Sequence, residues 1–190
     1  MPTLLAFDTS GAWCAAALLT EGGVTARAEE MSRGQAERLM DLLEEVLADA
    51  GLGWADLDGI GVGIGPGNFT GTRIAVSAAR GIALGRGIPA IGVSSFAAQA
   101  EGRSPCTVVL PGPRNIAHVQ IFGEVPDLPY ACPAESAPDG VALLPPEAMV
   151  ERIARIAAAG LGRPHPRPAP LYMRPADAAP ARDAGPVMLP

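Results

Sequence analysis

A glycine-rich segment at residues 61–73, with the sequence G-V-G-I-G-P-G-N-F-T-G-T-R, constrains the fold of this chain more than any other stretch. It leads from an apolar run typical of a buried strand into a helix that we expect to begin with Thr70 as its N-cap. A strand that turns through glycines into a helix is common at phosphate sites, because backbone amides and the helix dipole attract an anion. The same glycines equally suit a tight turn that lets backbone segments approach closely. The residues alone leave both interpretations open.

The first half of the chain alternates between strand and helix patterns in an order that predicts a mixed α/β sheet. Apolar runs bounded by turn residues predict strands, and apolar residues at helical spacing predict helices. The order is a three-strand meander followed by β-α-β crossings (βββαβαβ), which is also the order in half of an actin/Hsp70-like (ribonuclease H-like) fold. The expected strands are residues 3–7, 13–19, 24–31, 58–64 and 89–93, and the expected helices are residues 35–50, 70–86 and a short helix to 100 capped by Ser94 or Ser95.

The second half of the chain carries weaker patterns. We expect strands at residues 107–110 and 117–122, and a helix at residues 146–159. Prolines are dense between residues 124 and 139, and the tail is rich in Pro, Ala and Arg, which favours an extended or disordered strap. The predicted division is an N-terminal lobe at residues 1–103, a reduced second lobe at 104–162 and a strap at 163–190.

The basic residues exclude several enzyme classes. All 14 of them are arginine, so the chain has no lysine for a Walker-type loop, a Schiff base or a kinase site. The net charge of −6 argues against bulk electrostatic binding of nucleic acid. No apolar run is long enough to span a membrane and no signal peptide is expected, so we expect a cytoplasmic protein.

The titratable residues give no pattern of a catalytic or metal site. The cysteines are far apart, and neither His118 nor His165 has a partner at helical spacing, so we expect no metal. Asp8, with Thr9 and Ser10, ends the first strand, where an acidic residue of an actin-like fold can bind magnesium. We expect these three residues instead to cap the turn, as a vestigial site, and we expect no catalytic residue.

Four segments of this chain resemble the TsaB (YeaZ-type) family. The segment at 61–73 is similar to the family's G-x-G-P-G-S-F-T-G-L-R motif, with Asn68 for Ser and Thr72 for Leu. The opening L-L-A-F-D-T-S, the stretch R-G-Q-A-E-R-L-M at 33–40 and L-Y-M-R-P-A-D at 171–177 resemble the family's first strand, first helix and closing strap. The motif residues carried over are Gly65, Pro66, Gly67, Phe69, Thr70, Gly71 and Arg73, which form the vestigial phosphate site if the chain retains one.

This resemblance implies a non-catalytic subunit with an actin-like fold. Its family works with a TsaD-type catalytic subunit and a TsaE-type ATPase to form threonylcarbamoyladenosine in tRNA, which this chain would contact only indirectly. It implies no resident cofactor, and allows ATP or ADP only at an interface with a partner. It also allows a homodimer when the partner is missing.

Two helices are the expected docking surface for the TsaD-type subunit. The predicted helix at 70–86 is apolar or small on more than one side, so one side needs a partner outside its own sheet, unless both sides are buried in the monomer. The residues assigned to docking are Leu39, Leu42, Leu43, Val46, Leu47, Ile74, Ala75, Ala78, Ala79 and Ile82.

The second lobe departs from the family pattern. In the family, this lobe opens with a strand that reads like D-A-R-x-x-E-V-Y. The corresponding stretch of this chain is residues 110–119, which retains an arginine, Arg114, but lacks the acidic residues. This places in doubt any function of a cleft between lobes. The competing interpretation is an enzyme, either an actin-like ATPase or a glycoprotease-like protein.

Overall fold

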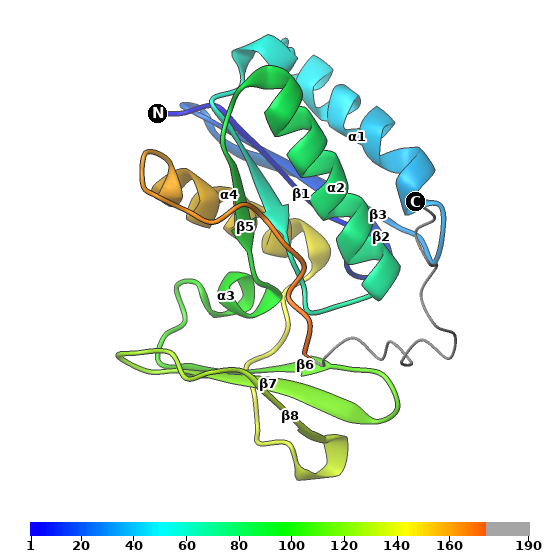
Figure 1. The fold of residues 1–190 in the computed structure, drawn as a ribbon, viewed down its shortest axis with the longest axis vertical. Coiled ribbons are helices and arrows are strands. Elements are labelled where there is room, and N and C mark those ends of the chain that lie inside the picture. The colour runs from blue at the N-terminus through cyan, green and yellow to red at the C-terminus, as the bar shows by residue number, and fades with distance from the viewer. Residues whose placement is uncertain (174–190) are drawn as a thin grey trace, which may run out of the picture.

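The computed structural model describes residues 1–173 and contains two β-sheets, one large and one small (Figure 1). The large sheet and its helices come first in the chain. Their elements are β1 (Leu4–Asp8), β2 (Trp13–Thr20), β3 (Gly23–Glu30), α1 (Gln35–Asp49), η1 (Trp54–Asp56), β4 (Gly59–Gly63), α2 (Phe69–Arg86), β5 (Ala90–Val93) and α3 (Ser95–Ala100). The later elements are β6 (Cys106–Pro111), β7 (Ile116–Phe122), β8 (Tyr130–Pro133), η2 (Ala134–Ser136) and α4 (Pro146–Gly160).

The large sheet confirms the predicted βββαβαβ order. Its strands lie in the order β3-β2-β1-β4-β5. The pairs β1–β2 and β2–β3 are antiparallel hairpins, while β1–β4 and β4–β5 are parallel. The chain passes from β3 to β4 through α1 and from β4 to β5 through α2. Antiparallel strands can be joined by tight turns, whereas parallel strands need a crossover, and the chain supplies each where its pattern predicts it.

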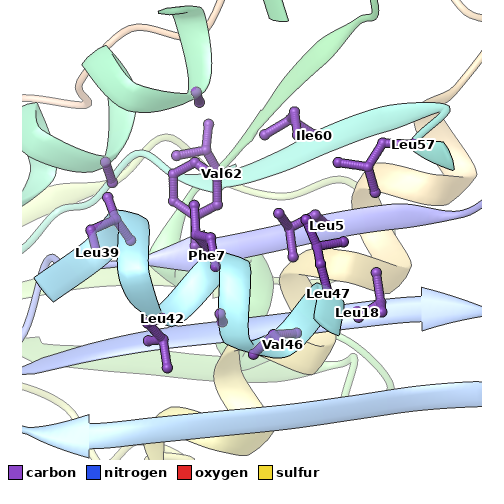
Figure 2. Close-up of a cluster of buried hydrophobic side chains, with 14 of the residues drawn as sticks. Leu5, Phe7, Leu18, Leu39, Leu42, Val46, Leu47, Leu57, Ile60 and Val62 are labelled. Atoms are coloured by element: carbon purple, nitrogen blue, oxygen red, sulfur yellow. The ribbon is translucent and has the colours of Figure 1, made fainter. Parts of the chain in front are cut away.

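The core on one face of the large sheet is formed by α1 and α2. Alternate residues of β1 point to opposite faces of the sheet, so Leu5 and Phe7 contact this helical layer. Figure 2 shows Phe7 and Val62 of the sheet next to Leu39 of α1, and Leu5 beside Leu47. The apolar stripe of α1 is therefore buried against its own sheet.

The opposite face of the large sheet is covered by α4, which comes from far along the chain (Figure 1). Leu4 and Ala6 of β1 pack there with Ile153, Ala154 and Ala157. A Cβ placed on Gly61 would lie 2.9 Å from Cβ of Ala157, so glycine in β4 permits the helix to lie close. The predicted lobe boundaries differ from the structure here. They place α4 in the second lobe, at residues 104–162, whereas the helix packs on the sheet of the first lobe.

The small sheet, β6-β7-β8, is what remains as a second lobe. β8 lies in the proline-dense stretch where we expected no strand. Its Pro133 is the last residue of the strand, paired with Ile116, a position at the end of an edge strand where a missing amide is tolerated. A small cluster that includes Phe96, Val108 and Leu110 joins this sheet to α3.

The strap extends along the large sheet as far as the structure describes it. A Cβ on Gly92 would lie 3.5 Å from Cβ of Pro168, and the amide of Leu171 donates to the carbonyl of Ile64 at 2.8 Å. Residues 174–190 of the predicted strap lie outside the described residues. Within residues 1–173, no helix is both long and apolar enough to cross a membrane.

Candidate functional site

The turn after β1 and the glycine-rich loop before α2 interlock through their backbones. The Thr9 hydroxyl donates to the carbonyl of Gly71 at 2.7 Å, and the Asn68 amide donates to the carbonyl of Ser10 at 2.6 Å. A Cβ on Gly71 would lie 1.9 Å from the Thr9 carbonyl oxygen. Glycine is therefore required here because two backbone segments occupy the space of a side chain.

The start of α2 is capped from within the loop. The side-chain oxygen of Asn68 accepts from the Gly71 amide at 2.9 Å, and its carbonyl accepts from the Thr72 amide at 2.9 Å. Asn68, not the predicted Thr70, is the N-cap, because the helix begins at Phe69, two residues earlier than a helix capped by Thr70 would begin. The amides of Asn68, Gly71 and Thr72 are thus engaged by the protein itself, which supports a packing role for this turn. The vestigial phosphate site stays a prediction.

Asp8 is a buried carboxylate held by its own turn. Its Oδ2 accepts from the Ser10 amide at 3.1 Å, the Ser10 hydroxyl at 3.0 Å and Nε1 of Trp13 at 2.9 Å. Its Oδ1 has no hydrogen-bond partner among residues 1–173. A Cβ placed on Gly63 would lie only 2.0 Å from this oxygen, so glycine is needed at that position. Burial raises the pKa of Asp8, and the three donors oppose this rise only in part. The expected turn-capping role of Asp8 agrees with this geometry.

Asp8→Asn is expected to remove one component of the pH dependence of stability. The pKa of Asp8 is raised in the folded state above its ordinary 3.8, so the folded protein binds more protons than the unfolded chain above about pH 4. The contribution of Asp8 to stability is therefore present at low pH and is lost as pH rises through the folded pKa. Urea unfolding at several pH values should show a wild-type stability that falls relative to Asp8→Asn as pH rises. A difference independent of pH would contradict this prediction.

The motif loop and the strap meet in an exposed cluster of Phe69, Arg73 and Tyr172. Nε of Arg73 donates to the Tyr172 hydroxyl at 2.8 Å, and its guanidinium carbon lies 3.7 Å from the Phe69 ring centroid. The two aromatic rings are 5.5 Å apart at their centroids. Both segments resemble the family pattern, but their sequences do not predict that they are in contact. Their separation of 99 residues leaves no local signal for it.

The predicted docking residues divide between core and surface. Buried in the monomer, and therefore unable to contact a partner in this conformation, are Leu39, Leu42, Leu43, Val46, Leu47, Ala75 and Ala79. The assignment of these residues to docking is corrected here, because the apolar stripe of each helix faces its own sheet. Partly exposed are Ile74, Ala78 and Ile82 of α2.

The outward side of the helical layer carries apolar residues that the assignment omitted. Met40 of α1 is 41% exposed and Leu84 of α2 is 83% exposed. Around Met40, α1 presents Glu37, Asp41 and Glu44 to solvent, while α2 exposes Arg80 near Leu84. Figure 1 shows the two helices side by side on the same face of the sheet. We call the exposed and partly exposed apolar residues of this side the outer helical face, namely Met40, Ile74, Ala78, Ile82 and Leu84, of which Leu84 lies toward the strap, in a hollow that His165 and Pro168 also line.

The histidines lie apart from this region. His118 is 8% exposed in β7 of the small sheet, and His165 is on the strap, partly buried. Among the residues that the structure describes, no three of His, Cys, Asp and Glu gather in a way that could hold a metal ion.

Known proteins are similar to this chain in sequence and in fold. Residues 17–110 match the family described as TsaD, tRNA N6-adenosine threonylcarbamoyltransferase. A protein of Haemophilus influenzae described as "tRNA threonylcarbamoyladenosine biosynthesis protein TsaB" is 40% identical over 99 residues, which cover 52% of this chain and 42% of that protein. The Escherichia coli protein of the same description is 37% identical over 99 residues, covering 52% and 43%. The matches thus span less than half the length of these relatives.

A solved structure extends the similarity to nearly the whole chain. The structure described as YeaZ from Pseudomonas aeruginosa superposes with a TM-score of 0.75 and 25% identity, covering 90% of this chain and 100% of that one. The mixed five-stranded sheet therefore has the actin-like fold of that protein, and the predicted fold class is confirmed.

Proposed function

We propose that this chain is a TsaB/YeaZ-type protein that serves as a non-catalytic subunit in the formation of threonylcarbamoyladenosine in tRNA, and that it binds a TsaD-type catalytic subunit. The observation that supports this best is the similarity to TsaB proteins of that pathway, together with the family match at residues 17–110, which include α1 and α2 in full. In this proposal a TsaE-type ATPase acts in the same cytoplasmic assembly, and tRNA is contacted only indirectly. ATP or ADP binds only at a partner interface.

The outer helical face is the proposed docking surface. Met40 and Leu84 are exposed, Ile74, Ala78 and Ile82 are partly exposed, and the buried stripes of the same two helices hold them on the sheet. Apolar residues clustered on a rigid surface and rimmed by charge are the usual anatomy of a protein interface. In the absence of the catalytic subunit, the same face pairs with a second copy of the chain.

Size-exclusion chromatography with light scattering tests the docking. The chain mixed with the TsaD-type protein of its own organism should form a one-to-one complex, and Leu84→Glu should weaken it by tenfold or more, because a carboxylate is desolvated at the interface. Leu128→Glu is the matched control, since Leu128 is 88% exposed on the small sheet's side of the molecule. Equal complex formation by both variants would place the interface elsewhere.

The alternative, an actin-like ATPase or glycoprotease-like enzyme, has a separate test. In the proposed function, the purified chain hydrolyses neither ATP nor a glycoprotein without its partners. Turnover by the chain alone, abolished by Asp8→Asn but not by Leu84→Glu, would establish an enzyme instead.

A further inference from the structure

The hollow that Leu84 lines has a volume of about 550 Å³ and lies between the end of α2, the start of β5 and the strap. α2 supplies Arg80 and Leu84, the segment after it supplies Ile88, and the strap supplies His165 and Arg167. The strap runs beside β5 (Figure 1), so it closes one side of the hollow. The volume falls in the range of about 300–1,000 Å³ that is typical of binding sites.

The ionisable side chains of this hollow are all basic. Within the described part of the chain, no Asp or Glu lines it. Arg27, Arg38 and Arg152 each pair with a carboxylate elsewhere in the protein. Arg80 and Arg167, in contrast, form no ion pair or hydrogen bond with any residue that the structure describes. Two unpaired guanidinium groups in one hollow, in a chain with a net charge of −6, favour an anionic occupant.

The dipole of α2 does not explain these two charges. The carbonyl groups at the end of a helix attract cations mainly within its last turn. Arg86 lies in that turn and Gly87 is the C-cap, whereas Arg80 lies about two turns before the cap. Arg167 belongs to no helix. The two arginines are therefore not needed to stabilise the helix end.

The rest of the lining is apolar and determines which anion fits. Leu84 is 83% exposed, Ile88 is partly buried, and Ala90 and Pro168 are buried. Inorganic phosphate would neutralise the arginines but would leave the exposed carbon surface in water. A peptide with an apolar side chain between carboxylates covers both parts of the lining, because a guanidinium group binds a carboxylate with two parallel hydrogen bonds.

We propose that this hollow binds an acidic segment of the docked protein partner. An apolar side chain of that segment contacts Leu84 and Ile88, and its flanking carboxylates pair with Arg80 and Arg167. This inference deepens the proposed docking and rests on it, since Leu84 belongs both to the hollow and to the outer helical face. It adds the charge of the partner's surface, which apolar contacts alone do not specify.

Fluorescence anisotropy with the labelled hexapeptide Glu-Leu-Glu-Glu-Leu-Glu tests the hollow on the full chain without its partner. The peptide should bind with a Kd below about 1 mM, and at least tenfold more weakly when NaCl is raised from about 50 mM to about 500 mM, because salt screens exposed charges. Lys-Leu-Lys-Lys-Leu-Lys should not bind, and inorganic phosphate at the peptide's own concentration should not displace the acidic peptide. Absence of binding by the acidic peptide, or its displacement by phosphate, would overturn the proposal.

A double substitution of the two arginines identifies the hollow as the site. Arg80→Gln with Arg167→Gln should weaken peptide binding at least tenfold and leave the Tm unchanged, because both side chains are exposed. The matched control is Arg114→Gln with Arg155→Gln, which removes the same two charges from exposed positions outside the hollow. Equal weakening by both variants would show that net charge alone attracts the peptide and would refute the site.

The chain's own C-terminal residues are the competing occupant, because they include Asp177 and Asp183. Asp177→Asn with Asp183→Asn in the full chain should leave the affinity for the acidic peptide unchanged. Tighter peptide binding by this variant would assign the hollow to the chain itself and overturn the assignment to a partner.

The complex with the TsaD-type protein separates this inference from the docking itself. Arg80→Gln with Arg167→Gln should weaken the complex about tenfold at low salt, and the control pair of substitutions should leave it unchanged. Failure of the wild-type chain to form a complex would overturn the docking, and the acidic segment with it. A wild-type complex that Leu84→Glu disrupts but the arginine variant retains at full affinity would refute the acidic segment alone.

Discussion

Gly71→Ala is expected to destabilise the protein by about 3 kcal/mol or more, at the upper end of the usual cost of overpacking. The added Cβ would lie 1.9 Å from the carbonyl oxygen of Thr9 and 2.9 Å from its carbonyl carbon. Neither atom can rotate away, because both belong to the backbone of the turn after β1. The clash therefore separates the turn from the start of α2. It also breaks the hydrogen bond that the Thr9 hydroxyl donates to the Gly71 carbonyl. Chemical denaturation with circular dichroism measures the loss.

Gly81→Ala in the same helix is the matched control. No atom lies within 4 Å of a Cβ placed on Gly81, so alanine meets open space there. Alanine also favours the helical backbone over glycine, and the variant should be more stable than wild type by about 0.5–1 kcal/mol. Destabilisation of similar size by both substitutions would show that helix propensity, and not the contact with Thr9, determines the result.

Leu43→Glu is expected to abolish cooperative folding, whereas Met40→Glu on the same helix is expected to keep it. Leu43 is fully buried between α1 and the large sheet, where a carboxylate has no partner and a Leu side chain contributes about 2–5 kcal/mol. Met40 is 41% exposed, so its substitution should change stability by no more than about 0.5 kcal/mol. Thermal unfolding followed by circular dichroism compares the two.

This pair of variants also determines how docking experiments must be interpreted. Loss of a complex with Leu43→Glu would report unfolding, while loss with folded Met40→Glu would report the outer helical face. A folded Leu43→Glu protein with wild-type Tm would contradict the assignment of α1 to the core.

The sequence predicted the large sheet because its signals are local. Apolar runs such as β1 and β2, separated by turn residues, specify strands over a few positions, and the spacing from Leu39 to Leu47 specifies α1 within its own length. The glycine-rich segment likewise predicts the junction of β4 and α2 from its own residues, without information from the rest of the chain.

The site was less predictable because its contacts are not local. Helical periodicity shows that α1 has an apolar face but not whether the sheet or a partner covers it, so core residues were assigned to docking. The packing of α4 on the first sheet and the contact of Tyr172 with Arg73 depend on the tertiary fold. Asn68 was missed as N-cap because Thr70 has the same capping chemistry two residues later.

The most direct test of the proposed function is the formation of threonylcarbamoyladenosine in tRNA by the TsaD- and TsaE-type proteins of the same organism, supplied with an activated threonylcarbamoyl donor that carries the label in its threonine, with and without this chain. Incorporation of labelled threonine into tRNA should require the chain, persist with Leu128→Glu, and fall at least tenfold with Leu84→Glu. Full incorporation without the chain, or equal incorporation with both variants and no complex on the column, would contradict a role as a docking subunit.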